Sequence, residues 1–440
     1  MNWTRLVRGA TASAACAATV VAVAACGSSS SSSSSAAAPS SSAGSTTAST
    51  PSGSSGSAGA SGAVLGTAHT ASGTPIKFGM INVETNAGAD FPEVRESAQA
   101  AIQYINTYRN GLDGHPIQLV PCITDGQPAT SASCANKLIS DHPVADIGGA
   151  DIGQAASLPI LQKAGIAQIG GVDLTPAESS FPNSIIFADV AQTGNSDMGI
   201  YAVKNLHAKK VAVIAIGDTQ GIFQAQHGEL PAVKAAGGQA KLFELPPTQA
   251  DASSVVSAAL AYNPDVVEIE SPSQCVAILN ALHSLGNTKP IMSIDPCSAP
   301  PVIAATSGAA NGMLWFQPFD NLIASNSADA NLTKAVLAKY APAKMPVDSP
   351  ALAGFASVMN IWSAFHNTPV SKLTSAYMLK TLKTGSGHAN FLASPYTCDG
   401  AAIPTEKAVC SAGQQLYQIK DNKPVLVTAG PYTAGVSLAG

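Results

Sequence analysis

Residues Val211-Ala212-Val213-Ile214-Ala215-Ile216 form an unbroken apolar run that ends at Gly217-Asp218. A run of this length is typical of a buried strand and is far too short to span a bilayer. The stretch 193–206 before the run predicts a helix, and further strands are predicted after it. The run therefore indicates one strand of a sheet that is covered by helices.

The same alternation of strands and helices continues on both sides of this run. The predicted strands are 77–83, 117–123, 145–148, 167–169, 185–188, 211–216, 241–244, 266–270, 290–293, 313–316, 415–419 and 424–427. The predicted helices are 90–109, 129–140, 154–163, 193–206, 251–261, 272–285, 328–339 and 350–365, with Asp90 and Glu93 as a capping-box-like start of the first. Strands separated by 10–15-residue helices favour parallel sheets, so we expect an α/β protein with two doubly wound lobes.

The chain has 440 residues and a formal net charge of −5. We find no basic patch and no interleaving of aromatic and basic residues, so nucleic acid is not an expected partner. After the N-terminal region described below, about 365 residues remain, which is more than one hydrophobic core usually holds. The length therefore supports two lobes.

The N-terminal region has the three parts of a secretory signal peptide. Arg5 and Arg8 precede an apolar stretch from Ala10 to Ala25, and small residues stand before Cys26. A Cys in this position resembles the lipobox of bacterial lipoproteins, although Val23 stands where Leu is commoner. The resemblance implies that residues 1–25 are removed and that lipidated Cys26 anchors the protein to the extracytoplasmic face of the cell membrane. The alternative is an ordinary secretory signal with a chance Cys.

From Cys26 to Ile76 the chain contains no Lys, Arg, Asp or Glu and consists mostly of Ser, Ala, Gly and Thr. Such a segment cannot bury enough apolar surface to fold. We therefore expect residues 26–73 to form a lipidated, disordered tether, with a mean span of roughly 35–40 Å.

Six further cysteines fall into three local couples, which are Cys122 with Cys134, Cys275 with Cys297, and Cys398 with Cys410. No CxxC or Cys/His spacing typical of a metal site is present. Although six cysteines allow about fifteen pairings, we predict three disulfides between neighbours, as suits an oxidising compartment.

An ordered series of short motifs carries a family resemblance. The motifs are 76–79, 98–106, 117–119 with Asp125 and Pro128, 134–139, 144–148, and 209–214 with Asp218 and Gly221. The series resembles the type I periplasmic binding proteins, especially the branched-chain amino-acid group, over about residues 74–430.

The resemblance implies two lobes joined by three hinge crossings, which we expect near Val190, Pro318 and Ser394. Lobe 1 is then 74–190 and 319–394, and lobe 2 is 191–318 and 395–430. The implied function is that of a monomeric solute-binding lipoprotein, which closes over a small molecule and delivers it to an ABC permease in the membrane. The alternatives are a ligand-sensing receptor subunit and a secreted enzyme on the same scaffold.

Ligands of this fold bind where loops converge at the carboxyl ends of parallel strands. The candidate binding residues that follow predicted strands are Ala150, Asp151, Gln154, Asp173, Thr175, Asp218, Gln220, Ser271, Ser273 and Asp295. Trp315, at the second expected crossing, is a further candidate.

The candidates differ from those of amino-acid-binding relatives. Asp295 is consistent with the acidic residue that holds the ligand ammonium group in that group. Asp151 and Asp173, however, stand where small or hydroxyl residues are usual, and a carboxylate there repels a ligand carboxylate. Gln220 replaces an aromatic wall. We therefore expect a polar ligand, neutral or cationic, and not leucine. The alternative is that Asp151 or Asp173 points away or caps a helix, and that Trp315 only packs at a hinge.

Motifs for catalysis are missing from the sequence. Residues 148–153 lack the middle glycine of GxGxxG, and no Walker loop, HExxH or GxSxG is present. We therefore predict no catalytic residue, no cofactor and no metal ligand.

Overall fold

The computed structural model describes residues 63–86, 90–190 and 192–428. All of them belong to one unit, Ser55–Gly440. The predicted signal peptide and Cys26 lie outside the described residues, as does most of the tether. In the part that the structure describes, no helix has both the length and the apolar character that a membrane span requires.

The first sheet is parallel throughout. From edge to edge it contains β2 (Ile117–Thr124), β1 (Ile76–Val83), the single bridging residue Asp146, β3 (Gln168–Ile169) and β4 (Ser184–Ile185). Beyond β4, Ile186 pairs with Val409.

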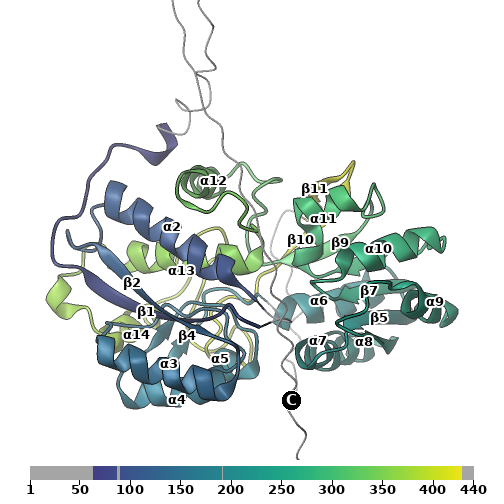
Figure 1. The fold of residues 1–440 in the computed structure, drawn as a ribbon, viewed down its shortest axis with the longest axis horizontal. Coiled ribbons are helices and arrows are strands. Elements are labelled where there is room, and N and C mark those ends of the chain that lie inside the picture. The colour runs from purple at the N-terminus through teal and green to yellow at the C-terminus, as the bar shows by residue number, and fades with distance from the viewer. Residues whose placement is uncertain (1–62, 87–89, 191, 429–440) are drawn as a thin grey trace, which may run out of the picture. The chain divides into compact units, whose positions relative to one another are not determined.

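Helices cover both faces of this sheet (Figure 1). Its helices are α2 (Pro92–Tyr108), α3 (Pro128–Asp141), α4 (Gln154–Lys163), α5 (Pro176–Ser180), α12 (Ala328–Tyr340), α13 (Ser349–Phe365) and α14 (Ser375–Leu382). One core packs Phe78 and Met80 against α2 and α13, and a smaller core packs Ile81 against α3. Helices α2 and α13 lie so close that a Cβ on Gly354 would stand 2.2 Å from the carbonyl oxygen of Val94, so only glycine fits there.

The second sheet has seven strands. Their order is β11 (Lys423–Leu426), β10 (Gln415–Lys420), β9 (Leu314–Gln317), β8 (Ile291–Ser293), β7 (Val266–Glu270), β5 (Lys210–Ile216) and β6 (Gln239–Leu245). The strands from β5 to β9 are parallel, whereas β10 and β11 are antiparallel to their neighbours.

Two further cores lie on the opposite faces of the second sheet. Its helical elements are α6 (Gln192–Lys204), α7 (Thr219–Gln224), the π-helix η1 (Ala225–Glu229), α8 (Leu230–Ala236), α9 (Ser253–Ala261), α10 (Cys275–Ser284), the 3₁₀ turn η2 (Asp295–Ser298) and α11 (Pro300–Ala305). A third short turn, η3 (Val370–Lys372), lies between α13 and α14. The predicted α/β class with two parallel-sheet parts is confirmed.

Three local predictions differ from the structure. Helix α2 begins one residue later than a cap at Asp90 requires, because Phe91 is the N-cap and no side chain caps it. The predicted strand 145–148 pairs only at Asp146. Residues 408–410, which the prediction gives to lobe 2, hydrogen-bond to Ser179 of α5 and to Ile186 beside the first sheet.

The last part of the predicted tether is packed onto the first sheet's helices. Leu65 is buried in the main core. The N–H of Ala71 donates to the carbonyl of Asn106, and the N–H of Gly73 donates to that of Gly114. Composition alone predicts disorder here, because backbone hydrogen bonds to α2 and to the loop after it cannot be inferred from composition.

The three predicted disulfides are all present. They join Cys122 to Cys134, Cys275 to Cys297, and Cys398 to Cys410, with Cα–Cα distances of 5.5, 5.3 and 4.4 Å. The Cys398–Cys410 disulfide closes the loop that contains Val409, which pairs with Ile186. The disulfide thus helps to hold this irregular loop beside the first sheet.

Asp146 places a carboxyl group in the middle of the first sheet, where its side chain is buried. Its Oδ1 accepts a hydrogen bond from the N–H of Gly148 at 3.2 Å. Burial, together with a smaller repulsion from Asp151, raises the pKa of Asp146 to about 7. An acid with a raised folded-state pKa stabilises the fold fully below its unfolded pKa and loses that stabilisation as pH rises through the folded pKa.

We expect Asp146→Asn to remove this loss of stability between pH 4 and about 7. The amide keeps an acceptor for Gly148 but never ionises. The variant should therefore gain on the order of 4 kcal/mol over the wild type between pH 4 and pH 8, measured as the free energy of urea unfolding. Asp421→Asn, in an exposed turn, is the control and should follow the wild type. An advantage of Asp146→Asn that does not grow with pH would contradict the assignment.

Candidate functional site

A cavity of about 120 Å³ lies where strands of both sheets end. Its lining comes from the loops after β3, β5, β7 and β8 and from the first turns of α6 and α13. The carboxyl ends of parallel strands leave backbone groups unpaired, which is why ligand sites form there.

Apolar side chains make most of the wall. They are Phe91, Val172, Leu174, Val190, Met198, Ile216, Ile294 and Phe316. The polar lining consists of Asn195, Asp218, Gln220, Gln224, Glu270, Ser293, Asp295 and Ser349. Among the described residues that line the cavity there is no Lys, Arg or His.

Hydrogen bonds cross the cavity from one sheet's elements to the other's. The carbonyl of Leu174, after β3, accepts from Gln220 Nε2 at 2.9 Å and from Gln224 Nε2 at 3.2 Å. On another side, Asp295 Oδ2 accepts from the N–H of Ser349, at the start of α13, at 2.6 Å. These contacts close the cavity around its apolar walls.

Three carboxyl groups give the cavity its electrostatic character. Asp218 caps α7 by accepting from the N–H of Gly221 at 2.8 Å. Glu270 is buried and its Oε2 has no hydrogen-bond donor, and burial followed by repulsion from Glu229 raises its pKa well above the usual range. Burial also raises the pKa of Asp295, against the hydrogen bonds from Ser349. The cavity therefore favours hydrogen-bond donors and cations over anions.

Of the predicted binding residues, Asp218, Gln220 and Asp295 line this cavity. All three follow strands of the second sheet, after β5 or β8. That these three residues contact a ligand stays a prediction.

The candidates after the strand residue Asp146 have internal partners instead. Asp151 accepts from Thr124 Oγ1 at 2.9 Å and from Ser131 Oγ at 2.6 Å, and it also accepts from the N–H of Gly153 just before α4. The N–H of Ala150 donates to Asn82 Oδ1, and Gln154 is buried at the start of α4. Asp151 thus holds the loop, as the alternative reading expected.

The candidates after β3 also point away from the cavity. Asp173 is fully buried, and its Oδ1 accepts from the N–H of Val190 at 2.9 Å. Burial and the neighbouring Asp189 raise the pKa of Asp173 well above its usual value. Thr175 forms a capping box with Glu178 at the start of α5.

The remaining candidates are structural or exposed. Ser271 donates to Gln274 Oε1 at 2.9 Å, and Ser273 is exposed. Trp315 is buried in the second sheet's core, where it stacks on Tyr417 and donates to Gln317 Oε1 at 2.8 Å. It therefore packs, as the alternative reading expected.

Several lining residues were not predicted. Asn195 and Met198 come from α6, and Ser349 and Pro350 begin α13. Helix starts also converge on the strand ends in an α/β fold, so a search that includes them would have found these residues.

Comparison with known proteins places this geometry in a family. A family model described as "Periplasmic binding protein" matches residues 75–403. A comparison with curated proteins finds no match.

Solved structures share the fold at low sequence identity. A leucine-binding protein from Thermotoga maritima is 19% identical and has a TM-score of 0.63, with 80% of this chain and 98% of that chain covered. A fatty acid ABC transporter substrate-binding protein from Thermomonospora curvata is 17% identical with a TM-score of 0.67, covering 82% and 93%. A solute-binding protein from R. palustris, in complex with 4-hydroxybenzoate, is 17% identical with a TM-score of 0.66, covering 82% and 97%.

The predicted resemblance and fold are therefore confirmed, and the relatives found are binding proteins. The chain belongs to the periplasmic binding protein family and has the type I fold of the substrate-binding proteins of ABC transporters.

Proposed function

We propose that this protein is a lipid-anchored, extracytoplasmic solute-binding protein that delivers a small molecule to an ABC permease and catalyses no reaction. The observation that carries the proposal is the cavity between the two sheets, closed by hydrogen bonds from Gln220, Gln224 and Asp295. Hinged closure over a ligand fits this arrangement. The family membership supports the substrate-binding role.

The lining supports a ligand with an apolar body and a neutral or cationic donor group. Apolar walls favour the body, and Asp218, Glu270 and Asp295 favour donors. The proposed ligand is therefore neutral or cationic, as expected from the sequence, and also has an apolar part. A free carboxylate on the ligand would meet three carboxyl groups and no basic side chain among the described lining residues.

A matched ligand panel tests the proposed ligand class. Leucine and 3-methylbutylamine share one apolar body and one amine and differ by the carboxylate. 4-Hydroxybenzoate and 4-hydroxybenzylamine share a phenol ring, and the second has an aminomethyl group in place of the carboxylate. We expect each amine to bind at least 10-fold more tightly than its acid by calorimetry, since each 1.4 kcal/mol of repulsion is a factor of ten. Mass spectrometry of co-purified compounds gives an independent reading. A large melting shift with leucine alone would refute the class.

Closure can be tested separately with Gln220→Ala/Gln224→Ala. The double variant removes both side-chain donors to the Leu174 carbonyl, and each neutral hydrogen bond is worth about 1 kcal/mol. We expect the radius of gyration from X-ray scattering to rise relative to the wild type. Gln239→Ala, at an exposed site on β6, is the control. An unchanged radius would mean that these contacts do not hold the closed form.

The lipid anchor rests on Cys26 and the residues before it. We expect Cys26→Ala to move the protein from the membrane fraction to the soluble extracytoplasmic fraction, as detected by immunoblot. Retention of the variant on membranes would argue against lipidation at this position.

A further inference from the structure

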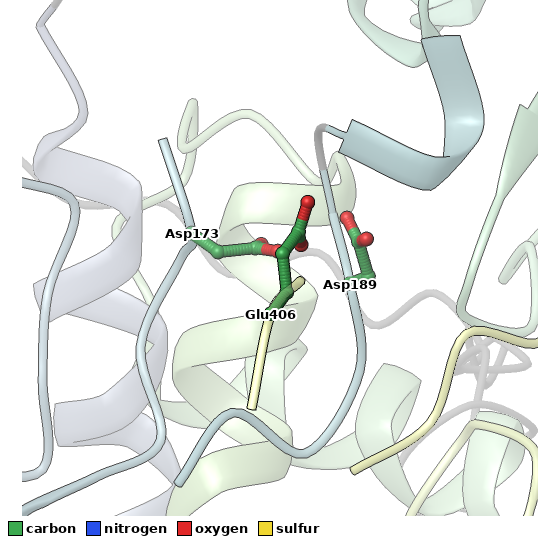
Figure 2. Close-up of side chains that lie close together, drawn as sticks. All are labelled: Asp173, Asp189 and Glu406. Carbon is green, nitrogen blue, oxygen red and sulfur yellow. The ribbon is translucent and has the colours of Figure 1, made fainter. Parts of the chain in front are cut away.

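Three buried carboxyl groups meet beside the cavity, outside the lining already described. They belong to Asp173, Asp189 and Glu406, and one ligand oxygen of each lies within 4.8 Å of the others. Figure 2 shows the three side chains converging from separate segments of the chain. Asp173 and Asp189 are fully buried, and Glu406 is 5% exposed.

Between described residues the one ion pair is Arg95 with Glu84, so neither Asp173 nor Glu406 is paired with a described basic side chain. Lys407, next to Glu406, donates to the carbonyl of Gly400 at 3.0 Å instead. Burying several like charges without a counter-charge is costly, so the cluster needs a cation or bound protons.

Two of the three carboxyl groups also keep an oxygen without a donor. Asp173 Oδ2 and Glu406 Oε2 are both buried and no described donor outside the cluster reaches them. Hydrogen bonds to other oxygens hold two of the side chains in position. Asp173 Oδ1 accepts from the N–H of Val190, and Asp189 Oδ2 accepts from the N–H and the hydroxyl group of Thr193. Both side chains are thus held in place, and at Asp173 and Glu406 an oxygen remains available.

We propose that Asp173, Asp189 and Glu406 bind a calcium ion. All donors are oxygens, which hard cations prefer over nitrogen and sulfur ligands. Calcium–oxygen distances of 2.3–2.6 Å place opposite ligands about 5 Å apart, so the observed spacing suits this ion. Calcium also accepts irregular coordination, with water filling the remaining positions.

The ion joins three segments that meet at the first crossing between the sheets. Asp173 lies in the loop after β3, Asp189 just before α6, and Glu406 within the loop closed by the Cys398–Cys410 disulfide. Val172, Leu174 and Val190, the direct neighbours of Asp173 and Asp189, line the cavity. Bound calcium would therefore hold part of the cavity wall in position. That the wall contacts a solute rests on the proposed function.

The test uses purified protein stripped with EGTA and then given CaCl₂. We expect one calcium per chain by calorimetry and elemental analysis, and a rise in Tm of about 3–6 °C at 5 mM. Glu406→Gln and, as a second variant, Asp173→Asn should bind calcium at least 10-fold more weakly. Asp399→Asn, an exposed acid in the same loop, should respond like the wild type.

Three results would overturn the proposal. The wild type could bind no calcium and show the same Tm with and without it, which would mean that protons neutralise the cluster. Magnesium could give the same response at equal concentration. Glu406→Gln and Asp173→Asn could respond as strongly as Asp399→Asn, which would place the ion elsewhere. None of these readouts needs the solute, so a failure of the solute proposal stays separate.

Discussion

The backbone carbonyl of Leu174 is the point at which the two sheets of this protein are joined across the cavity. A carbonyl beyond the end of a buried parallel strand needs a donor, and here the donors are Gln220 and Gln224 of α7, beside the other sheet. The hydrogen bond between Ser349 and Asp295 repeats this arrangement at the start of α13. Because closure removes these polar groups from water, each needs a protein partner in the closed form, and these hydrogen bonds supply it.

Carboxyl groups are buried in the second sheet as well. Glu268 and Glu270 lie on the same face of β7, next to Glu229 of the π-helix η1, and burial raises the pKa of all three, for Glu229 to about 7. π-Helical turns are frequent at functional sites, and here the turn places a carboxyl group behind the cavity wall. Because Glu270 lines the cavity, this cluster makes its second-sheet side a favourable environment for a positive or proton-donating group.

Periodicity predicted most strands and helices to within a few residues, because buried strands and amphipathic helices have distinct patterns. Sequence position after a strand also predicted Asp218, Gln220 and Asp295 as cavity residues. The same rule was wrong for Asp151, whose partners Thr124 and Ser131 are 27 and 20 residues away. Glycines with positive φ, such as Gly148 and Gly170, turn these loops, so the direction of the next side chain depends on backbone geometry that strand position does not specify.

The packing of Leu65 and Ala71 against the first sheet's helices has a mechanical consequence. The chain enters β1 at Ile76, at the amino end of the strand, whereas the cavity lies at the carboxyl ends. A pull on the preceding segment is therefore borne by one sheet and its helices alone, through the hydrogen bonds at Ala71 and Gly73. Such a force acts on one half of the protein, at the end of its sheet away from the cavity, and so does not load the hydrogen bonds from Gln220 and Gln224 to Leu174.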